Sequence, residues 1–190
     1  MMAEKQKMKS SKTSSITALL AEQIGRENAL SLPRIDRIVV NVGVGRRVVA
    51  EGPKSLAPII KDLERITGQK PVVRLSRKAV ASFKLREGLP VGLMVTLRGK
   101  RAEDFLTRLV RTALPRTRDF RGVPLKALDK GGNLTIGIRE QIIFPEAAAD
   151  STGIVFGMEV TIVTTTRDRS EAEILLRALG VPFQKIESAK

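Results

Sequence analysis

Helix-type and strand-type apolar patterns follow one another in a mixed order along this chain of 190 residues, and that order restricts its fold more than any other feature. Short apolar runs bounded by turn residues predict strands at 34–45, 70–76, 89–98 and 157–166. Apolar residues at helical spacing predict helices at 16–25, 52–68 (starting late, because of Pro58), 100–115 and 168–180. The segment KGGNLTIGIREQIIF (130–144) offers a Gly-Gly turn between β-like runs. The sequence therefore predicts an α+β fold: a single domain over 16–190, with a largely antiparallel sheet and helices packed on one side.

The first 15 residues have low hydrophobicity and four lysines, which is typical of a disordered basic tail. A transit peptide would carry arginine and an amphipathic stripe, and this segment has neither. A peripheral membrane protein is an alternative that only this tail suggests, and no strongly apolar face adjoins it. Since no apolar run approaches the roughly 18 residues of a membrane span, we expect a protein without a membrane partner.

The chain contains no Cys, His, Trp or Tyr. Disulfides, thiolate metal sites and cysteine nucleophiles are therefore excluded, and the commonest general base is missing. Glu103 and Asp104 are adjacent on a predicted helix and cannot converge on one point, and the Ser and Lys residues of 76–84 form no S-x-x-K motif. We expect no enzyme, metal or cofactor. The alternative is a nucleotide-binding or nucleic-acid-modifying protein that uses the turn GVGRR (43–47), which lacks the third glycine of the dinucleotide fingerprint.

The net charge of +14 is distributed unevenly along the chain. Residues 1–130 carry 28 basic and 12 acidic side chains, a net charge of +16, whereas 131–190 carry 6 and 8, a net charge of −2. Lys and Arg gain affinity for nucleic acid by releasing counterions condensed on the phosphates. The asymmetry therefore predicts that residues 1–130 provide a phosphate-facing surface and that 131–190 have another role. The alternative is a soluble protein that is basic without a specific nucleic-acid site.

The segment PVVRLSRKAVASFKLREGLPVG (71–92) places five basic side chains and one acid between two β-like runs. Cationic residues alternate there with Val, Leu, Ala and Phe, so an extended arm would present cations on one side and a small apolar surface on the other. Contacts that follow the backbone of a folded RNA need such an arrangement, with Phe83 available for stacking or for anchoring the loop. The alternative is a hairpin whose exposed face is merely soluble.

Eight longer motifs resemble, in the same order, those of bacterial-type ribosomal protein five of the large subunit, the L-five family. They are RIVVNVGVG, ITGQKPVV, SFKLREGLPVG, VTLRG, ALPRTRDFRG, GNLTIGIREQIIFPE, GMEVTIVTT and LLRALGVPF. The resemblance runs from about Leu32 to Phe183. It implies a non-enzymatic protein of the central protuberance of a cytoplasmic ribosome. The implied partners are 5S rRNA, 23S-type rRNA, peptidyl-site tRNA, small-subunit ribosomal protein thirteen and the neighbouring central-protuberance proteins.

The resemblance also implies which residues make the contacts. Through VVNVG, TGQKP and VTLRG it carries the 5S rRNA site to Asn41, Gln69 and Thr96, with Arg37, Gly43, Arg47, Lys70 and Arg98 beside them. It makes 77–88 the tRNA-facing loop, with Arg77, Lys78, Ser82, Phe83, Lys84 and Arg86. Such a loop serves every elongator tRNA, so its contacts should reach phosphates and sugars rather than bases.

A bridge to small-subunit protein thirteen is implied for the less basic C-terminal part. Its candidate residues are Glu140, Glu146 and Asp150, which surround the apolar residues of REQIIFPEAAAD. Acidic side chains would guide association with a basic ribosomal protein. The alternative is an ordinary solvated acidic loop.

Overall fold

The computed structural model describes residues 16–26, 28–118, 120–148 and 153–184, so the predicted tail 1–15 lies outside the described residues. Contacts divide the chain into two compact units. The larger unit comprises 37–120 and 135–162, and the smaller comprises the described parts of 1–36, 121–134 and 163–190.

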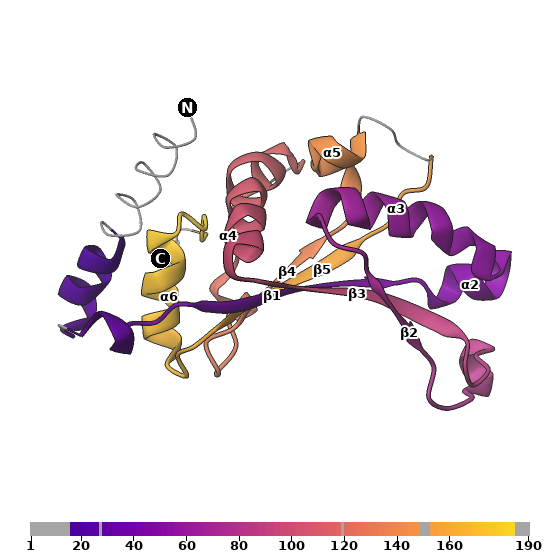
Figure 1. Ribbon diagram of the computed structural model, residues 1–190, viewed down its shortest axis with the longest axis horizontal. Coiled ribbons are helices and arrows are strands. Elements are labelled where there is room, and N and C mark those ends of the chain that lie inside the picture. The colour runs from indigo at the N-terminus through magenta and orange to yellow at the C-terminus, as the bar shows by residue number, and fades with distance from the viewer. Residues whose placement is uncertain (1–15, 27, 119, 149–152, 185–190) are drawn as a thin grey trace, which may run out of the picture. The chain divides into compact units, whose positions relative to one another are not determined.

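A five-stranded sheet lies mainly in the larger unit (Figure 1). Its strands are β1 (Ile35–Gly43), β2 (Val72–Leu75), β3 (Pro90–Arg98), β4 (Leu134–Ile138) and β5 (Met158–Thr164). Their order across the sheet is β2-β3-β1-β5-β4, and β3 pairs antiparallel with both β1 and β2. The four strands predicted at 34–45, 70–76, 89–98 and 157–166 and the α+β class with a largely antiparallel sheet are confirmed. Of the β-like runs beside the Gly-Gly turn, the one after the turn forms β4, whereas the one before it contains a 3-10 turn, Leu125–Ala127.

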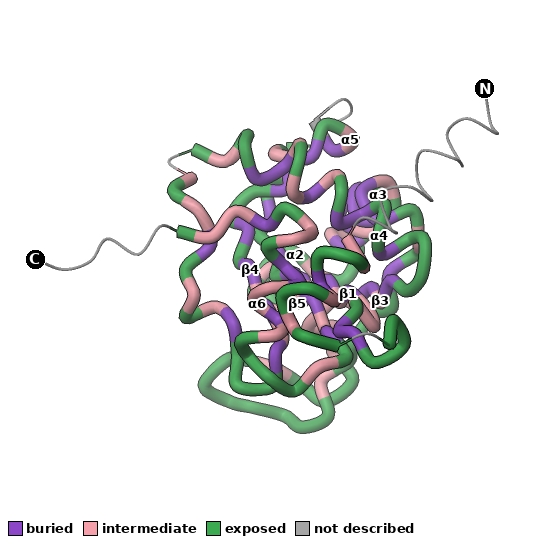
Figure 2. Tube along the Cα trace, turned by 90° about the vertical axis from the view of Figure 1, so that its left-hand side faces the viewer, coloured by how far each residue is buried: buried purple, intermediate pink, exposed green. Residues whose placement is uncertain are grey.

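One face of the sheet is buried and the other is open, because side chains alternate along each strand. In β1, Ile38, Val40 and Val42 are almost fully buried, whereas the residues between them are only partly covered. The strands β3, β4 and β5 show the same alternation. Figure 2 colours the chain by burial and shows buried segments alternating with partly buried ones. The fully buried residues of each strand thus face the core, and the other residues, polar and apolar, remain partly accessible.

The helices of the larger unit cover the buried face. They are α2 (Gly45–Glu51), α3 (Leu56–Thr67), α4 (Gly99–Arg108) and α5 (Pro145–Ala148), of which α3, α4 and α5 lie on one side of the strands in Figure 1. The late start of α3 places Pro58 in the first turn, where its missing N–H costs no helical hydrogen bond, and Gly68 ends α3 with φ of 68°. Between α4 and α5, the rings of Phe105 and Phe144 stack with centroids 5.9 Å apart.

Two predicted segments differ from what forms. The helix predicted over 100–115 changes after Arg108 into a π-helical turn, Leu109–Ala113, and then into a 3-10 turn, Leu114–Arg116. Pro115 has no N–H to continue the α-helical ladder, and its ring would crowd the carbonyl four residues earlier. The turn predicted at 43–47 instead opens the short helix α2 at Gly45.

The smaller unit contains the helix of residues 16–24 and α6 (Arg169–Ala178), as predicted. Leu20, Leu32 and Leu175 form its buried cluster and hold the two helices side by side. Asp168 caps α6 by accepting a hydrogen bond from the backbone N–H of Ser170. The pKa of Asp168 is lowered, chiefly because the side chain and the backbone of Ser170 donate hydrogen bonds to the carboxylate.

Candidate nucleic-acid interface

The open face of the sheet carries the polar residues that the sequence singled out. Register places Asn41 opposite Met94 and Val39 opposite Thr96, so Asn41 is a diagonal neighbour of Thr96, about 7–8 Å away. All four residues are partly exposed and alternate with buried apolar residues. The family resemblance assigned Asn41 and Thr96 to one site, and the structure places both on one accessible surface.

Gln69 reaches the same strand from the end of α3. Its Nε2 donates a hydrogen bond to the backbone oxygen of Thr96 at 3.5 Å, and its Oε1 accepts one from Arg101 Nη1 at 3.4 Å. The hydroxyl of Thr67 donates to the Leu63 and Gln69 carbonyls at 2.7 and 2.9 Å, which fixes the turn that leads to Gln69. The amide is thereby orientated from two sides.

Arg101 is the residue of this cluster that the sequence argument missed. It lies in the first turns of α4, directly after β3, and its side chain is exposed. A basic residue at the junction between a strand carrying Thr96 and the next helix was the available signal.

Cations border the open face. Arg37 and Arg98 are opposite each other in the β1–β3 register, and the Nη2 of Arg74 lies 3.7 Å from the sulfur of Met94. Lys70, between Gln69 and β2, is exposed. Basic groups therefore lie at the end of the β1–β3 pair and along the β2 edge.

Two of the remaining candidates are placed differently. Gly43 is exposed at the end of β1, and a Cβ added to it would meet nothing within 4 Å. Arg47 lies on α2 rather than on the sheet, and its Nη1 is 3.8 Å from a carboxylate oxygen of Glu51. Arg47 is thus partly neutralised by its own helix.

The loop between β2 and β3 extends past the strand ends in Figure 1. All six of its candidate residues are exposed: Arg77, Lys78, Ser82, Phe83, Lys84 and Arg86. It is folded rather than extended, because Val80 and Leu85 exchange two backbone hydrogen bonds, of 3.0 and 3.1 Å. Between them lies a 3-10 turn, Ala81–Phe83, followed by Lys84 in the left-handed region with φ of 53°. The cations are therefore presented by a hairpin tip with a defined backbone.

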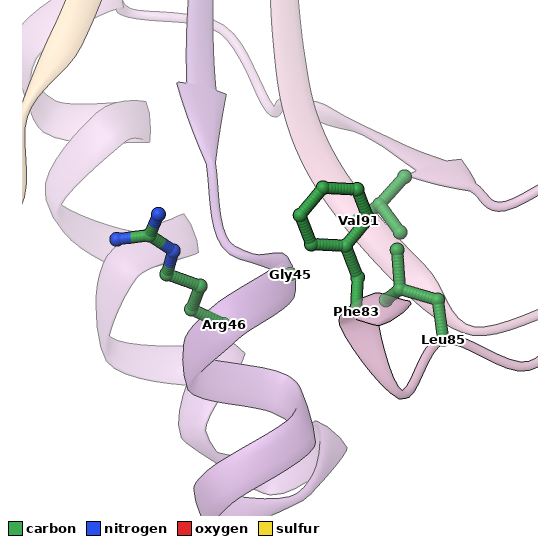
Figure 3. A pocket seen from close by; sticks show the side chains of 5 residues that line it. All are labelled: Gly45, Arg46, Phe83, Leu85 and Val91. Atoms are coloured by element: carbon green, nitrogen blue, oxygen red, sulfur yellow. The ribbon is translucent and has the colours of Figure 1, made fainter. Parts of the chain in front are cut away.

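A pocket of about 240 Å³ lies beside this hairpin tip, lined by Gly45, Arg46, Phe83, Leu85 and Val91. Figure 3 shows the side chains of Phe83, Leu85 and Val91 gathered on one side of Gly45, with the guanidinium of Arg46 pointing away from them. Phe83 is nevertheless 68% exposed. Its position supports the anchoring role considered for it and leaves part of the ring accessible.

The pocket offers little to a nucleotide. Apart from Arg46 its side chains are apolar, and α2 is too short to provide a helix-terminal anion site. Among the residues that the structure describes, no group of acidic side chains could hold a metal ion. Over the same residues, no helix is both long and apolar enough to cross a membrane.

The three acidic candidates do not form one surface group. Glu140 is exposed, Glu146 accepts a hydrogen bond from Arg108 Nη1 at 2.7 Å, and Asp150 lies outside the described residues. The buried side chain of Gln141, which the sequence argument did not single out, bonds the backbone of Ile154 and Phe156. The Gln141 side chain thus holds the segment 154–156 against the 3-10 turn at 141–143. Glu146 links α5 to α4 through Arg108.

Comparison with known proteins identifies the class. A family model described as ribosomal protein L5 matches residues 28–86, and the model that describes the C-terminus of this ribosomal protein family matches 90–183. The chain is 46% identical over 169 residues to the large ribosomal subunit protein uL5 of Heliobacterium modesticaldum, covering 89% of this chain and 93% of that protein. Identity to uL5 of Rubrobacter xylanophilus is 49%, with the same coverage, and to uL5 of Mesoplasma florum 46%, covering 95% of this chain and 99% of that protein.

These matches define a structural, non-enzymatic protein of the large ribosomal subunit. The chain belongs to the ribosomal protein L5 family. The family resemblance and the absence of an enzymatic role inferred from the motifs are thereby confirmed, and the enzyme alternative is wrong.

Proposed function

We propose that this protein binds 5S rRNA through the open face of its sheet, within the central protuberance of a cytoplasmic bacterial-type ribosome. The observation that carries the proposal is the cluster in which Gln69 is held between Arg101 and the Thr96 carbonyl, with Asn41 diagonal to Thr96. Uncharged polar groups that lie beside apolar residues such as Val39 and Met94 need hydrogen-bonding partners once the face is covered.

The charges support RNA as that partner. Arg98 and Arg74 border the cluster and provide cations for phosphates at its edge, while amide and hydroxyl groups meet riboses or bases. A protein surface covering the same face would have to offer acids to these two arginines.

The hairpin between β2 and β3 is proposed to contact peptidyl-site tRNA. Its exposed cations provide phosphate contacts independent of tRNA sequence, and the backbone pairing of Val80 with Leu85 holds them in place before binding. The folded tip supports this role because less loop entropy is lost when RNA binds.

The C-terminal part of the larger unit is proposed to meet small-subunit protein thirteen, with Glu140 as its best-placed acid because Glu146 is occupied by Arg108. Exposed Ile142 and Val155 add apolar surface near Gln141, which suits a small interface of mixed character. Contacts with 23S-type rRNA and with neighbouring central-protuberance proteins complete the proposed environment.

The test is a binding titration of the purified protein with 5S rRNA, and with a tRNA as a control of similar charge density. We expect 5S rRNA to bind at least tenfold more tightly than the control at physiological salt, and Asn41→Ala to reduce that preference. Equal affinity for both RNAs would contradict a specific 5S site. Thr107→Val, on the exposed side of α4, is the matched control and should bind as the parent does.

A further inference from the structure

The half of the open face formed by β5 and β4 differs chemically from the half formed by β1, β3 and β2. Its residues are Thr135 and Gly137 on β4 and Glu159, Thr161 and Val163 on β5, each placed between buried residues of its strand. None of these five is cationic, and Glu159 is exposed. This half thus offers phosphates no cation, and an RNA that lies across the whole sheet would place another part of its surface here.

Thr135 and Thr161 form a pair on this surface, with their hydroxyl oxygens 3.2 Å apart. Each hydroxyl has one donor and two acceptor positions, and their mutual bond uses one donor and one acceptor. One O–H donor and three lone pairs therefore remain for a ligand. A ribose 2′-hydroxyl, which both donates and accepts, complements such a pair.

Gly137 lies two residues from Thr135 on the same face of β4 and is exposed. A Cβ added to it would meet nothing within 4 Å in the protein. The fold therefore does not require glycine at this position for space, whereas a closely approaching ribose would.

We propose that Thr135 and Thr161 form a ribose-binding site that contacts 2′-hydroxyl groups of the RNA on the open face, with Gly137 allowing the close approach. The inference rests on the proposed 5S rRNA function and assigns a part of the RNA to this half of the sheet. β5 neighbours β1, so the pair lies about 5–10 Å from the Asn41 strand, within the span of one or two nucleotides.

The experiment compares the parent with the Thr135→Val, Thr161→Val double variant, which keeps the shape of both side chains and removes both hydroxyls. Binding of 5S rRNA should weaken about tenfold with an unchanged salt dependence, because hydrogen bonds and not ion pairs are lost. Gly137→Ala should weaken binding without changing the unfolding midpoint in urea. Thr107→Val is the control for loss of a threonine hydroxyl, since its Oγ1 bonds only within α4.

A second measurement makes the ribose assignment specific. 5S rRNA carrying random single 2′-deoxy substitutions is selected for binding, and the positions that interfere are mapped. We expect a few positions that interfere with the parent and no longer interfere with the double variant.

The outcomes separate the two proposals. If the parent binds 5S rRNA and both proteins give the same interference map, the ribose site is wrong and the 5S function stands. If the parent does not prefer 5S rRNA over the tRNA control, the proposed function fails and the ribose site fails with it.

Discussion

The contact between Arg101 and Gln69 predicts that these two residues act on RNA binding as a unit. Gln69→Ala removes the amide, and Arg101→Met removes the guanidinium that orientates it. Both hydrogen bonds of the amide are long, 3.4 and 3.5 Å, and Arg101 is exposed, so the free energy of unfolding should fall by less than about 1 kcal/mol in either variant.

RNA binding should respond more strongly than folding. Gln69→Ala would leave RNA groups unpaired in a desolvated contact, at a cost of about 1–3 kcal/mol. Arg101→Met should cost about 0.5–1.5 kcal/mol by releasing the amide, and it should lower the salt slope by about 1 if the guanidinium also meets a phosphate. In the Gln69→Ala background there is no amide for Arg101 to orientate, so Arg101→Met should weaken RNA binding less than it does in the parent.

The assay is a double-mutant cycle in 5S rRNA titrations at several salt concentrations. We expect a coupling energy of about 0.5–1 kcal/mol between the two substitutions. Arg111→Met, which removes another exposed arginine from the π-helical turn, is the control for loss of charge and should not couple to Gln69. Additive effects within about 0.3 kcal/mol would refute a positioning role for Arg101.

Three further predictions concern other parts of the chain. A triple alanine variant of exposed hairpin cations should leave 5S rRNA affinity unchanged; the residues are Lys78, Lys84 and Arg86. The same variant should weaken retention of peptidyl-site tRNA on assembled ribosomes and lower the magnitude of the salt slope of tRNA binding by about 2–3. Loss of 5S binding in this triple variant would argue against separate sites. Glu140→Lys should raise the magnesium midpoint of subunit association in light scattering, and an unchanged midpoint would leave it a solvated acid. Asn133→Ala should raise the pKa of Asp129, which hydrogen bonds from the Asn133 side chain and backbone lower, as measured by NMR titration. That stabilisation is present above the ordinary pKa of 3.8 and is lost as pH falls through the lower folded-state pKa, so the difference in stability between parent and variant should be larger at neutral pH than in strong acid. A part that does not depend on pH remains, because Asn133 Oδ1 also accepts a hydrogen bond from the Thr164 N–H.

Local pattern was sufficient for most of the fold. Short apolar runs bounded by turn residues predicted β1 at 34–45 and β3 at 89–98, because strand formation there depends on the local sequence. Asn41 and Thr96 came from the resemblance to the L-five family, and the side-chain period of two then places both among the partly exposed residues of their strands. Gly68 and Asp168 predicted the ends of their helices by capping chemistry that is equally local. The absence of His and Cys excluded most catalytic and metal chemistry by composition alone.

The hairpin tip shows where local pattern was insufficient. Alternating charge predicted an extended arm, but the backbone of Val80 pairs with that of Leu85 and places Lys84 in a conformation that glycine usually adopts. The pairing depends on the conformation of all the residues between Val80 and Leu85. The propensities of the single residues do not predict it.

The groupings that could act on RNA were decided by tertiary structure. Gln69 meets Thr96 across 27 residues and Arg101 across 32, and Thr135 meets Thr161 across 26. Arg108 similarly occupies Glu146, a carboxylate that the sequence left available for a partner. Periodicity determines which face of its own strand or helix a side chain occupies, whereas the strand order β2-β3-β1-β5-β4 and the packing of the helices determine which of those faces become neighbours.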